Sequence, residues 1–345
     1  MLGQLQKQHS KLVQEFNLDL RIRAIARSKK MLLGERHIEL AGWEDAFTAG
    51  AIDTDLEVLE QHVNPEHLPH AVIIDCTASE FIASRYADWL SRGVHVITPN
   101  KKAFSGPYAG YKALQVAADA GSSHYFYETT VGAALPIVNT LCDLLYTGDV
   151  VHSIRGIFSG TLAYLFNVYD GTRPFSDIVR DAKASGYTEP DPRDDLSGMD
   201  VARKLAILAR ELGRPLELGD FPVQNLVPEP LRECSVDEFL ERLSEHDEEI
   251  GTLYREAATA GKVLRYIAML DADGNAAVGL EAVEPKHPFA NINLTDNIVQ
   301  FQTERYSANP LVIQGPGAGP EVTAAGVFSD LLRLAAYLST GAGYV

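Results

Sequence analysis

The first half of the chain alternates between amphipathic stretches and short apolar runs. Apolar side chains recur with helical spacing in four stretches, residues 2–16, 53–62, 79–91 and 108–120. Between them lie strand-like runs, at residues 20–26, 71–75, 94–98 and 124–127. Strands that alternate with helices of this length predict a Rossmann-like α/β domain with a doubly wound parallel sheet.

The pattern changes near residue 150. Strands are expected at residues 150–158, 263–270, 276–283, 297–303 and 311–314, and helices at 161–169, 175–185, 198–212, 236–260 and 322–338. Asp273-Gly274 suits a hairpin turn. We therefore expect one domain over residues 1–148, a second, α+β domain over 149–314, and a segment, 315–345, whose Gly-rich turn and helix return to the first domain.

The start of the chain departs from the usual order of a dinucleotide-binding fold. Such a fold begins with a strand and a G-x-G-x-x-G turn that leads into the first helix. Here the helical pattern comes first, and Gly3 is the only nearby glycine. We therefore expect the first strand and its Gly-rich turn to precede residue 1.

Composition narrows the classes of partner. The chain is 46% hydrophobic and 22% charged, with a net charge of −17, and so is expected to be a soluble globular protein that repels nucleic acid and anionic membranes. No apolar run approaches the ~18 residues of a membrane span. Cys76, Cys142 and Cys234 lie far apart, which argues against disulfides or a zinc site and favours a cytoplasmic location.

Candidate chemistry gathers where expected strands end, which is where doubly wound sheets bind ligands. Thr77 follows the strand at 71–75 and forms an S/T-x-x-E capping box with Glu80, or else contacts a cofactor. Lys101 and Lys102 follow the next strand and can pair with phosphate or carboxylate, although two lysines are more often a solvated surface.

The stretch from Gly186 to Lys204 is the most informative. It crowds Glu189, Asp195 and further aspartates near one lysine, and Asp200 lies four residues before Lys204, on the same helix face. These residues can serve catalysis. The alternatives are a capping box of Ser197 with Asp200, a plain stabilising ion pair, or a magnesium site.

A Gly-rich turn, residues 315–319, opens the last helix. Its glycines allow a close backbone approach to a ligand, and the start of the helix offers free N–H groups. Taken alone, the turn is equally well explained as a flexible junction.

These segments together, in this order, resemble homoserine dehydrogenase, and most closely the dehydrogenase part of bifunctional aspartokinase–homoserine dehydrogenases. The resemblance implies NAD(P)-dependent interconversion of homoserine and aspartate 4-semialdehyde in threonine and methionine biosynthesis. It also implies a homodimer or higher homo-oligomer, with an aspartokinase region fused upstream. The second domain would then bind the substrate and form the dimer. Residues 309–319 lean towards the methionine-branch form.

The resemblance also implies roles for individual residues. Lys204 matches the proton donor, and Asp200, Glu189 and Asp195 match residues that hold the substrate. Lys102, with Lys101 beside it, matches the lysine near nicotinamide and substrate. The implied cofactor contacts are Thr77, Gly186 and Gly319. The implied ligands of a monovalent cation such as sodium are the Glu128 carboxylate and the carbonyls of Val131, Ala133 and Leu135.

The residues after the strand at 20–26 indicate whether NAD or NADP is preferred. NAD-binding folds often place an acid there for the ribose hydroxyl. This chain carries Arg27 and Ser28, followed by two lysines, which can accept a 2′-phosphate instead. We therefore expect NADP to be preferred and NAD to be possible, the alternative being a basic surface turn.

Two other functions stay open at this point. One is an aldehyde-oxidising dehydrogenase, which needs an activated cysteine to form a thiohemiacetal. The other is a catalytically silent dimerisation or regulatory module of a fused aspartokinase, since the turn that binds pyrophosphate is absent from the chain.

Overall fold

The structure is a computed structural model that describes residues 1–65 and 67–339. Contacts divide the chain into two compact units. Unit 1 comprises Met1–Ala103, Ala109–Tyr127 and the described residues from Thr323 onward, and unit 2 comprises Phe104–Tyr108 and Glu128–Val322. Residues 128–148, expected in the first domain, lie in unit 2 because the helix they contain packs against a helix of that unit.

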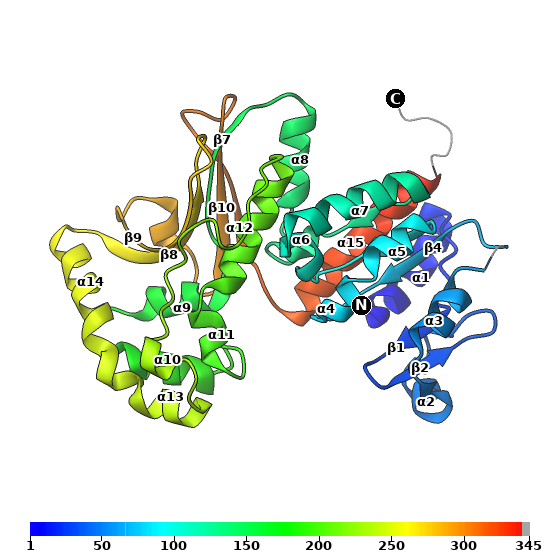
Figure 1. Cartoon of the computed structure of the whole chain (residues 1–345), viewed down its shortest axis with the longest axis horizontal. Helices are drawn as coiled ribbons and strands as arrows, with labels where there is room; N and C mark the ends of the chain where they lie inside the picture. Colours follow the sequence, from blue (N-terminus) through cyan, green and yellow to red (C-terminus); the bar gives the residue numbers. More distant parts are fainter. Residues whose placement is uncertain (66, 340–345) are drawn as a thin grey trace. The chain divides into compact units, whose positions relative to one another are not determined.

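Unit 1 is an α/β unit with two small sheets (Figure 1). Its strands are β1 (Ala24–Ala26), β2 (Lys30–Leu33), β3 (Ile52–Asp53), β4 (Ala71–Ile74), β5 (Val94–Ile97) and β6 (Tyr125–Phe126). Its helices are α1 (Leu2–Phe16), α2 (Trp43–Gly50), α3 (Leu56–Val63), α4 (Glu80–Ala83), α5 (Tyr86–Ser91), α7 (Tyr108–Gly121) and α15 (Pro320–Ser339), and α6 (Lys102–Ser105) joins the two units.

The predicted parallel sheet forms from β4, β5 and β6, in that order. Helices α1 and α15, from opposite ends of the chain, pack on it in one apolar cluster: Leu5, Leu12, Ile97, Val327, Leu331 and Leu334. The α/β fold class expected from the sequence is therefore confirmed, and the last helix packs in unit 1.

The stretch 20–26 does not join that sheet. Only Ala24–Ala26 is a strand, and it pairs antiparallel with β2, which in turn pairs antiparallel with β3. The Arg27 N–H donates to the Lys30 carbonyl at 2.8 Å, which closes a tight turn and sends the chain straight back beside β1. Short-range alternation predicted a strand here but not its partner.

Unit 2 is built on a five-stranded antiparallel sheet with the order β11-β10-β7-β8-β9. Its strands are β7 (Val151–Ile157), β8 (Val263–Leu270), β9 (Ala276–Val283), β10 (Asp296–Thr303) and β11 (Leu311–Pro316). Its helices are α8 (Val138–Tyr146), α9 (Gly160–Val168), α10 (Phe175–Ala184), α11 (Pro192–Leu196), α12 (Met199–Glu211), α13 (Val236–Arg242) and α14 (Asp247–Thr259), with short 3₁₀ turns η1 (Glu128–Thr130), η2 (Glu229–Leu231), η3 (Leu243–His246) and η4 (Pro288–Asn291).

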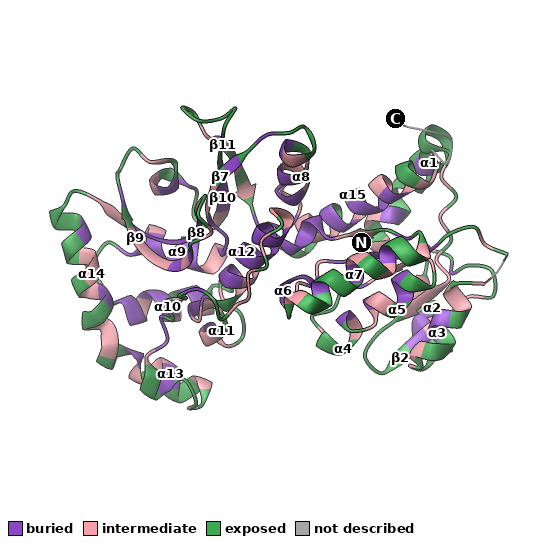
Figure 2. Cartoon of the chain, turned by 45° about the horizontal axis from the view of Figure 1, so that its top comes forward, coloured by how far each residue is buried: buried purple, intermediate pink, exposed green. Residues whose placement is uncertain are grey.

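Apolar side chains of the sheet and of α9 and η4 form the core of unit 2: Ile157, Ala163, Ile267, Val283, Phe289, Ile292 and Ile298. The hairpin between β8 and β9 turns at Gly274, as predicted from Asp273-Gly274. Figure 2 shows α12 largely buried, whereas α13 and α14 carry exposed residues on the outside of the unit.

A short segment of the N-terminal half, Phe104–Tyr108, is part of unit 2. The Arg210 guanidinium, on α12, donates to the Phe104 carbonyl at 2.7 Å and to the Gly106 carbonyl at 2.6 Å. The Tyr108 N–H donates to the Glu217 carboxylate at 2.7 Å. Chain from the first half is thus held against α12.

Four expectations for helices and their caps need correction. The helix expected over 236–260 is interrupted by η3, and the one over 79–91 is split between α4 and α5. Neither expected capping box forms. The Ser79 hydroxyl, not Thr77, caps α4. Gly198, not Ser197, is the N-cap of α12, and the Asp200 carboxylate pairs with Lys204.

Three histidines lie at the amino ends of the parallel strands. His70 precedes β4, His95 lies in β5, and His124 precedes β6, with ring centroids 5.8 and 5.5 Å apart along the row. His95 is 2% exposed, and its Nδ1 accepts the His124 N–H at 3.0 Å. Burial, reinforced by the two neighbouring imidazoles, lowers the pKa of His95 to about 4.

This row predicts acid sensitivity. Between pH 6.5 and about 4 the unfolded chain protonates His95 and the folded chain does not, so the free energy of unfolding should fall as the pH is lowered through this range. We expect a loss of about 2 kcal/mol, allowing for screening by water around the outer imidazoles. Urea unfolding at several pH values should show a shallower slope in His95→Gln than in His9→Gln, which removes an exposed histidine. Equal slopes would contradict the assignment.

Among residues 1–65 and 67–339, no helix combines the length and apolar character needed to cross a membrane.

Candidate active site

An ion pair in α12 is the centre of the predicted site. The Lys204 ammonium lies 2.7 Å from the Asp200 carboxylate and donates to the Phe158 carbonyl at 2.6 Å. Lys204 is 7% exposed, whereas about half of the Asp200 side chain is accessible. The carboxylate and the carbonyl fix the direction of the ammonium, which suits it to give a proton to a neighbouring oxygen.

Local sequence sets the start of α12. Gly198 has φ +71°, a conformation that L side chains rarely adopt. A Cβ at this position would lie 1.9 Å from the Tyr266 hydroxyl, which donates to the Gln224 carbonyl. Glycine is therefore required where the loop meets the sheet, and it fixes the position from which Asp200 and Lys204 extend.

The acidic loop before α12 is organised by Asp195. Its carboxylate accepts the Glu189 N–H and the Thr161 hydroxyl, both at 2.8 Å. Burial raises the pKa of the Asp195 carboxyl, against the effect of those hydrogen bonds. Glu189 itself is exposed, and Gly186 has φ +75° with open space where a Cβ would be. Asp195 thus shapes the loop and leaves the Glu189 side chain accessible to solutes.

Arg193 has a role that the sequence did not reveal. It pairs with the Asp191 carboxylate at 2.6 Å and donates to the Leu231 and Cys234 carbonyls. These contacts fix α11 to a segment some forty residues later in the chain. Its partners are backbone carbonyls of a distant loop, so no spacing pattern could have indicated them.

The magnesium alternative gains no support. Across the described residues, 1–65 and 67–339, no group of three or more His, Cys, Asp or Glu side chains is arranged to hold a metal ion. The acids of the loop are instead distributed among Arg193, Lys204 and backbone N–H groups.

In unit 1, a buried network organises the loops that follow β4 and β5. The Asp75 carboxylate accepts the Tyr86 hydroxyl at 2.5 Å, the Asn100 amide at 3.0 Å and the Thr77 N–H at 2.8 Å. The Asn100 side chain in turn accepts the Lys102 N–H at 3.1 Å. Both predicted segments, at Thr77 and at Lys102, are therefore held by the same carboxylate.

The sequence missed Asp75, Tyr86 and Asn100 as site-forming residues. Asp75 and Asn100 stand inside the segments that attracted attention, but Tyr86 lies on α5, and only the fold brings it to Asp75. Burial and the Asp75 carboxylate raise the pKa of the Tyr86 phenol, so it stays a hydrogen-bond donor. Lys101 and Lys102 are half-buried next to this network.

The predicted residues for cofactor choice lie in the turn between β1 and β2. Arg27 and Ser28 are exposed, the Arg27 guanidinium lies over the Phe47 ring at 5.0 Å, and the Thr54 hydroxyl donates to the Arg27 carbonyl. At the other end of the chain, Gly319 has φ +120° and open space where a Cβ would be. Both turns thus present polar or bare backbone surface to solvent.

The predicted cation loop shows a different use of its carboxylate. Glu128 is buried, and one of its oxygens accepts the N–H groups of Ile137 and Val138, both at 2.7 Å. The other oxygen accepts the Asn139 N–H at 2.9 Å and its side-chain amide. A carboxylate has about four acceptor positions, so Glu128 is fully used as the cap of α8 and does not fit as a cation ligand.

The cysteines do not fit the aldehyde-oxidising alternative. Loss of hydration and the Asp75 carboxylate raise the pKa of the Cys76 thiol, and burial with Glu211 raises that of Cys142. The Cys234 thiol donates to the Leu231 carbonyl. A thioester-forming enzyme needs a lowered thiol pKa, which neither Cys76 nor Cys142 has.

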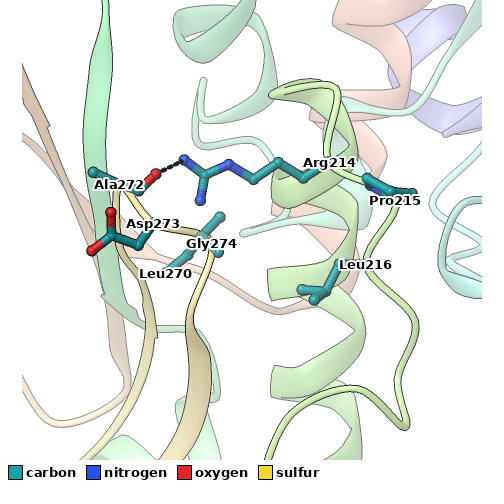
Figure 3. A pocket seen from close by; sticks show the side chains of 7 residues that line it. All are labelled: Arg214, Pro215, Leu216, Leu270, Ala272, Asp273 and Gly274. Atoms are coloured by element: carbon teal, nitrogen blue, oxygen red, sulfur yellow. Dashed lines mark hydrogen bonds between the residues drawn. The ribbon is translucent and has the colours of Figure 1, made fainter.

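A surface pocket of about 290 Å³ in unit 2 has none of the predicted site residues in its lining. It is lined by Arg214, Pro215, Leu216, Leu270, Ala272, Asp273 and Gly274. Figure 3 shows Arg214 reaching across it to the Ala272 carbonyl, at 3.1 Å. The guanidinium therefore holds the turn between β8 and β9.

Known proteins resemble the chain over nearly its whole length. The family model described as the NAD binding domain of homoserine dehydrogenase matches residues 1–128, and that described as homoserine dehydrogenase matches residues 136–332. A crystal structure of a Candida auris protein of unknown function superposes with a TM-score of 0.88 at 37% identity, over 97% of this chain and 94% of that one. A hyperthermophilic archaeal homoserine dehydrogenase in complex with NADPH, 19% identical, shares the fold with a TM-score of 0.74 over 96% and 93%.

Proteins with similar sequences indicate the same family. Bifunctional aspartokinase/homoserine dehydrogenase 2, chloroplastic, of Arabidopsis thaliana is 51% identical over 98% of this chain but only 37% of its own length. Homoserine dehydrogenase of Saccharomyces cerevisiae is 45% identical over 85% of this chain and 83% of its own. The chain thus spans little more than a third of the bifunctional relative and most of the yeast enzyme. On these matches, the chain belongs to the homoserine dehydrogenase family.

Proposed function

We propose that this protein interconverts L-homoserine and L-aspartate 4-semialdehyde with a nicotinamide cofactor. The observation that carries the proposal is the buried ammonium of Lys204, held between Asp200 and the Phe158 carbonyl at the start of α12. Membership of the family supplies the substrate class.

The chain's own residues have distinct tasks in this reaction. A bound nicotinamide supplies or accepts the hydride. In the reducing direction, negative charge develops on the aldehyde oxygen, and the Lys204 ammonium donates a proton to it and becomes a neutral amine. Asp200 favours the protonated form of Lys204 before this transfer. Glu189, whose carboxylate is exposed, binds the ammonium group of the substrate, and Lys102 binds its carboxylate.

Cofactor binding fits unit 1. Thr77 and Lys102 follow parallel strands at their carboxyl ends, where such sheets take nucleotides, and Asp75 fixes both loops. The family model for residues 1–128 supports a nicotinamide cofactor. We assign the preference for NADP to Arg27, with Ser28 beside it, in the exposed turn after β1.

Arg27→Ala should therefore raise the KM for NADPH about tenfold and leave the KM for NADH nearly unchanged, because only NADPH carries the phosphate that a guanidinium binds. Steady-state kinetics with both cofactors check this. Arg36→Ala, which removes another exposed arginine of unit 1, serves as the control. A wild-type protein that prefers NADH would contradict the assignment.

The proposed reaction is tested directly in the full-length protein. Homoserine with NADP should give a steady increase in reduced nicotinamide absorbance. 4-Hydroxybutanoate, which lacks the ammonium group, should react far more slowly, since Glu189 then has no partner. Absence of homoserine-dependent turnover at saturating NADP would reject the proposal and favour the silent module, which the family matches do not support.

Further proposals concern partners and ions. Because bifunctional relatives carry this region within a longer chain, we propose an aspartokinase region fused upstream. From the family resemblance we also propose a homo-oligomeric assembly and a role in threonine and methionine biosynthesis. The cytoplasmic location stays a prediction, as some plant relatives are described as chloroplastic.

We propose that a monovalent cation would bind to the backbone carbonyls of Val131, Ala133 and Leu135, without Glu128 as a ligand. Equal turnover in sodium and tetramethylammonium buffers would count against it.

A further inference from the structure

Asn297, on β10, is a buried polar residue that the proposed reaction does not use. It is 0% exposed, and its side-chain amide donates to the Phe158 carbonyl at 3.1 Å. That carbonyl is the same atom that accepts the Lys204 ammonium at 2.6 Å. One backbone oxygen thus joins Asn297 to the proposed proton donor.

The orientation of this amide is fixed by chemistry. A carbonyl can only accept, so the NH₂ end of Asn297 must face Phe158, and Oδ1 must point away. In the described part of the chain, Oδ1 is buried without a hydrogen-bond partner. A buried oxygen that loses its hydration and gains no hydrogen bond lowers the free energy of unfolding, and an apolar side chain of similar size would avoid this loss. The residue is therefore poorly explained by stability alone.

The Gly-rich turn packs against the amide. A Cβ at Gly317 would lie 2.0 Å from Nδ2 and 2.1 Å from Cγ of Asn297, so the backbone of the turn packs directly on this side chain. The Asn297 backbone also pairs with Gly315 on β11. The amide is therefore clamped between the turn and the Phe158 carbonyl.

We infer that Asn297 is a positioning residue for Lys204, because its clamped amide fixes the Phe158 carbonyl that directs the ammonium. The inference rests on the proposed function, in which Lys204 is the proton donor. When Asn297 is lost, the Phe158 carbonyl gains freedom to move, and Nζ follows it away from the substrate oxygen. Binding of homoserine through other residues should be affected much less.

The test compares variants in the full-length protein. Asn297→Ala should lower kcat by about 10–100-fold, the range that a misplaced catalytic group produces, with KM for homoserine changed less than about threefold. Gln300→Ala is the matched control. Gln300 also buries a side-chain oxygen without a partner, but it extends from the opposite face of β10, and its loss should leave kcat within about twofold.

Asn297→Asp adds a readout that a purely structural role would not move. An ionised carboxylate repels the Phe158 carbonyl, whereas a protonated carboxyl can donate to it as the amide does, and burial raises the pKa of such a group. The ratio of variant to wild-type kcat should therefore rise as the pH is lowered. If Asn297→Ala fails to fold, Asn297→Asp, which has a side chain of the same size, tests the inference. A ratio of variant to wild-type kcat that does not change with pH would overturn it.

Two further results separate the possible failures. If Lys204→Ala abolishes turnover while Asn297→Ala keeps a normal kcat, the positioning role is wrong and the proposed function stands. If Lys204→Ala itself retains turnover, the proposed function is wrong, whatever Asn297 does. An equal loss in Gln300→Ala would assign the effect to β10 in general and overturn the inference.

Discussion

Lys204→Ala is expected to lower kcat for homoserine about 1,000-fold, within the range that a positioned proton donor contributes. Lys204 is buried, but its charge is balanced by Asp200, whose carboxylate is about half accessible and can be hydrated once the lysine is gone. The folded structure should therefore survive the substitution. Stopped assays of turnover, together with far-UV circular dichroism of the same sample, separate loss of chemistry from loss of fold.

Lys262→Ala provides a matched control for this experiment. Lys262 is another lysine of unit 2 paired with a carboxylate, at 3.2 Å from Glu284, but Lys262 is partly exposed, Glu284 is exposed, and neither belongs to the predicted site. Its removal should change kcat less than twofold. Turnover near the wild-type value in Lys204→Ala would remove this residue from the chemistry.

Arg265→Met should lower the free energy of unfolding by about 3–5 kcal/mol, because several buried carbonyls lose their donor at once. Arg265 lies in β8 and is buried, no carboxylate of the described residues forms an ion pair with it, and burial lowers its pKa. Its guanidinium donates to four carbonyls, those of Phe166, Leu264, Phe289 and Ala290, at 2.7–3.0 Å. It thereby joins the end of α9 to η4 across the core of unit 2.

Methionine keeps most of the length and the apolar contacts of the arginine stem, so the difference reports mainly the lost hydrogen bonds. Urea unfolding followed by circular dichroism gives the measurement. Arg255→Met, on the exposed face of α14, removes a guanidinium whose main partner is the exposed Glu248, and should leave the unfolding midpoint unchanged. A loss below about 1 kcal/mol in Arg265→Met would show that water replaces the guanidinium.

Periodicity located most elements of this fold, because helices and buried strands impose regular spacing on apolar side chains. It also predicted that Asp200 and Lys204 share a helix face, and they form an ion pair. What local spacing cannot reveal is competition for a side chain. Asp200 fits a capping box by sequence, yet the lysine one turn later takes its carboxylate, and Ser197 is left to bond locally.

The same limit applies to contacts between distant segments. Tyr86 reaches Asp75, and Asn297 reaches the carbonyl beside Lys204, only after strands have paired. For Glu128, a contact close in sequence opposes the role that the resemblance implied. Its place in a family pattern suggested a cation, whereas the start of α8 nearby already occupies both oxygens. Hydrogen-bond partners of buried groups depend on topology, which short sequence windows do not contain.

The placement of Phe104–Tyr108 within unit 2 affects how the protein can be divided for experiments. A gene fragment encoding only residues 128–322 would lack five residues that belong to its own core. The buried Arg210 guanidinium would then lack two of the carbonyls that accept its hydrogen bonds. Such a fragment should aggregate or stay unfolded, and supplying the missing peptide in trans, or linking it to one terminus, should restore a folded product.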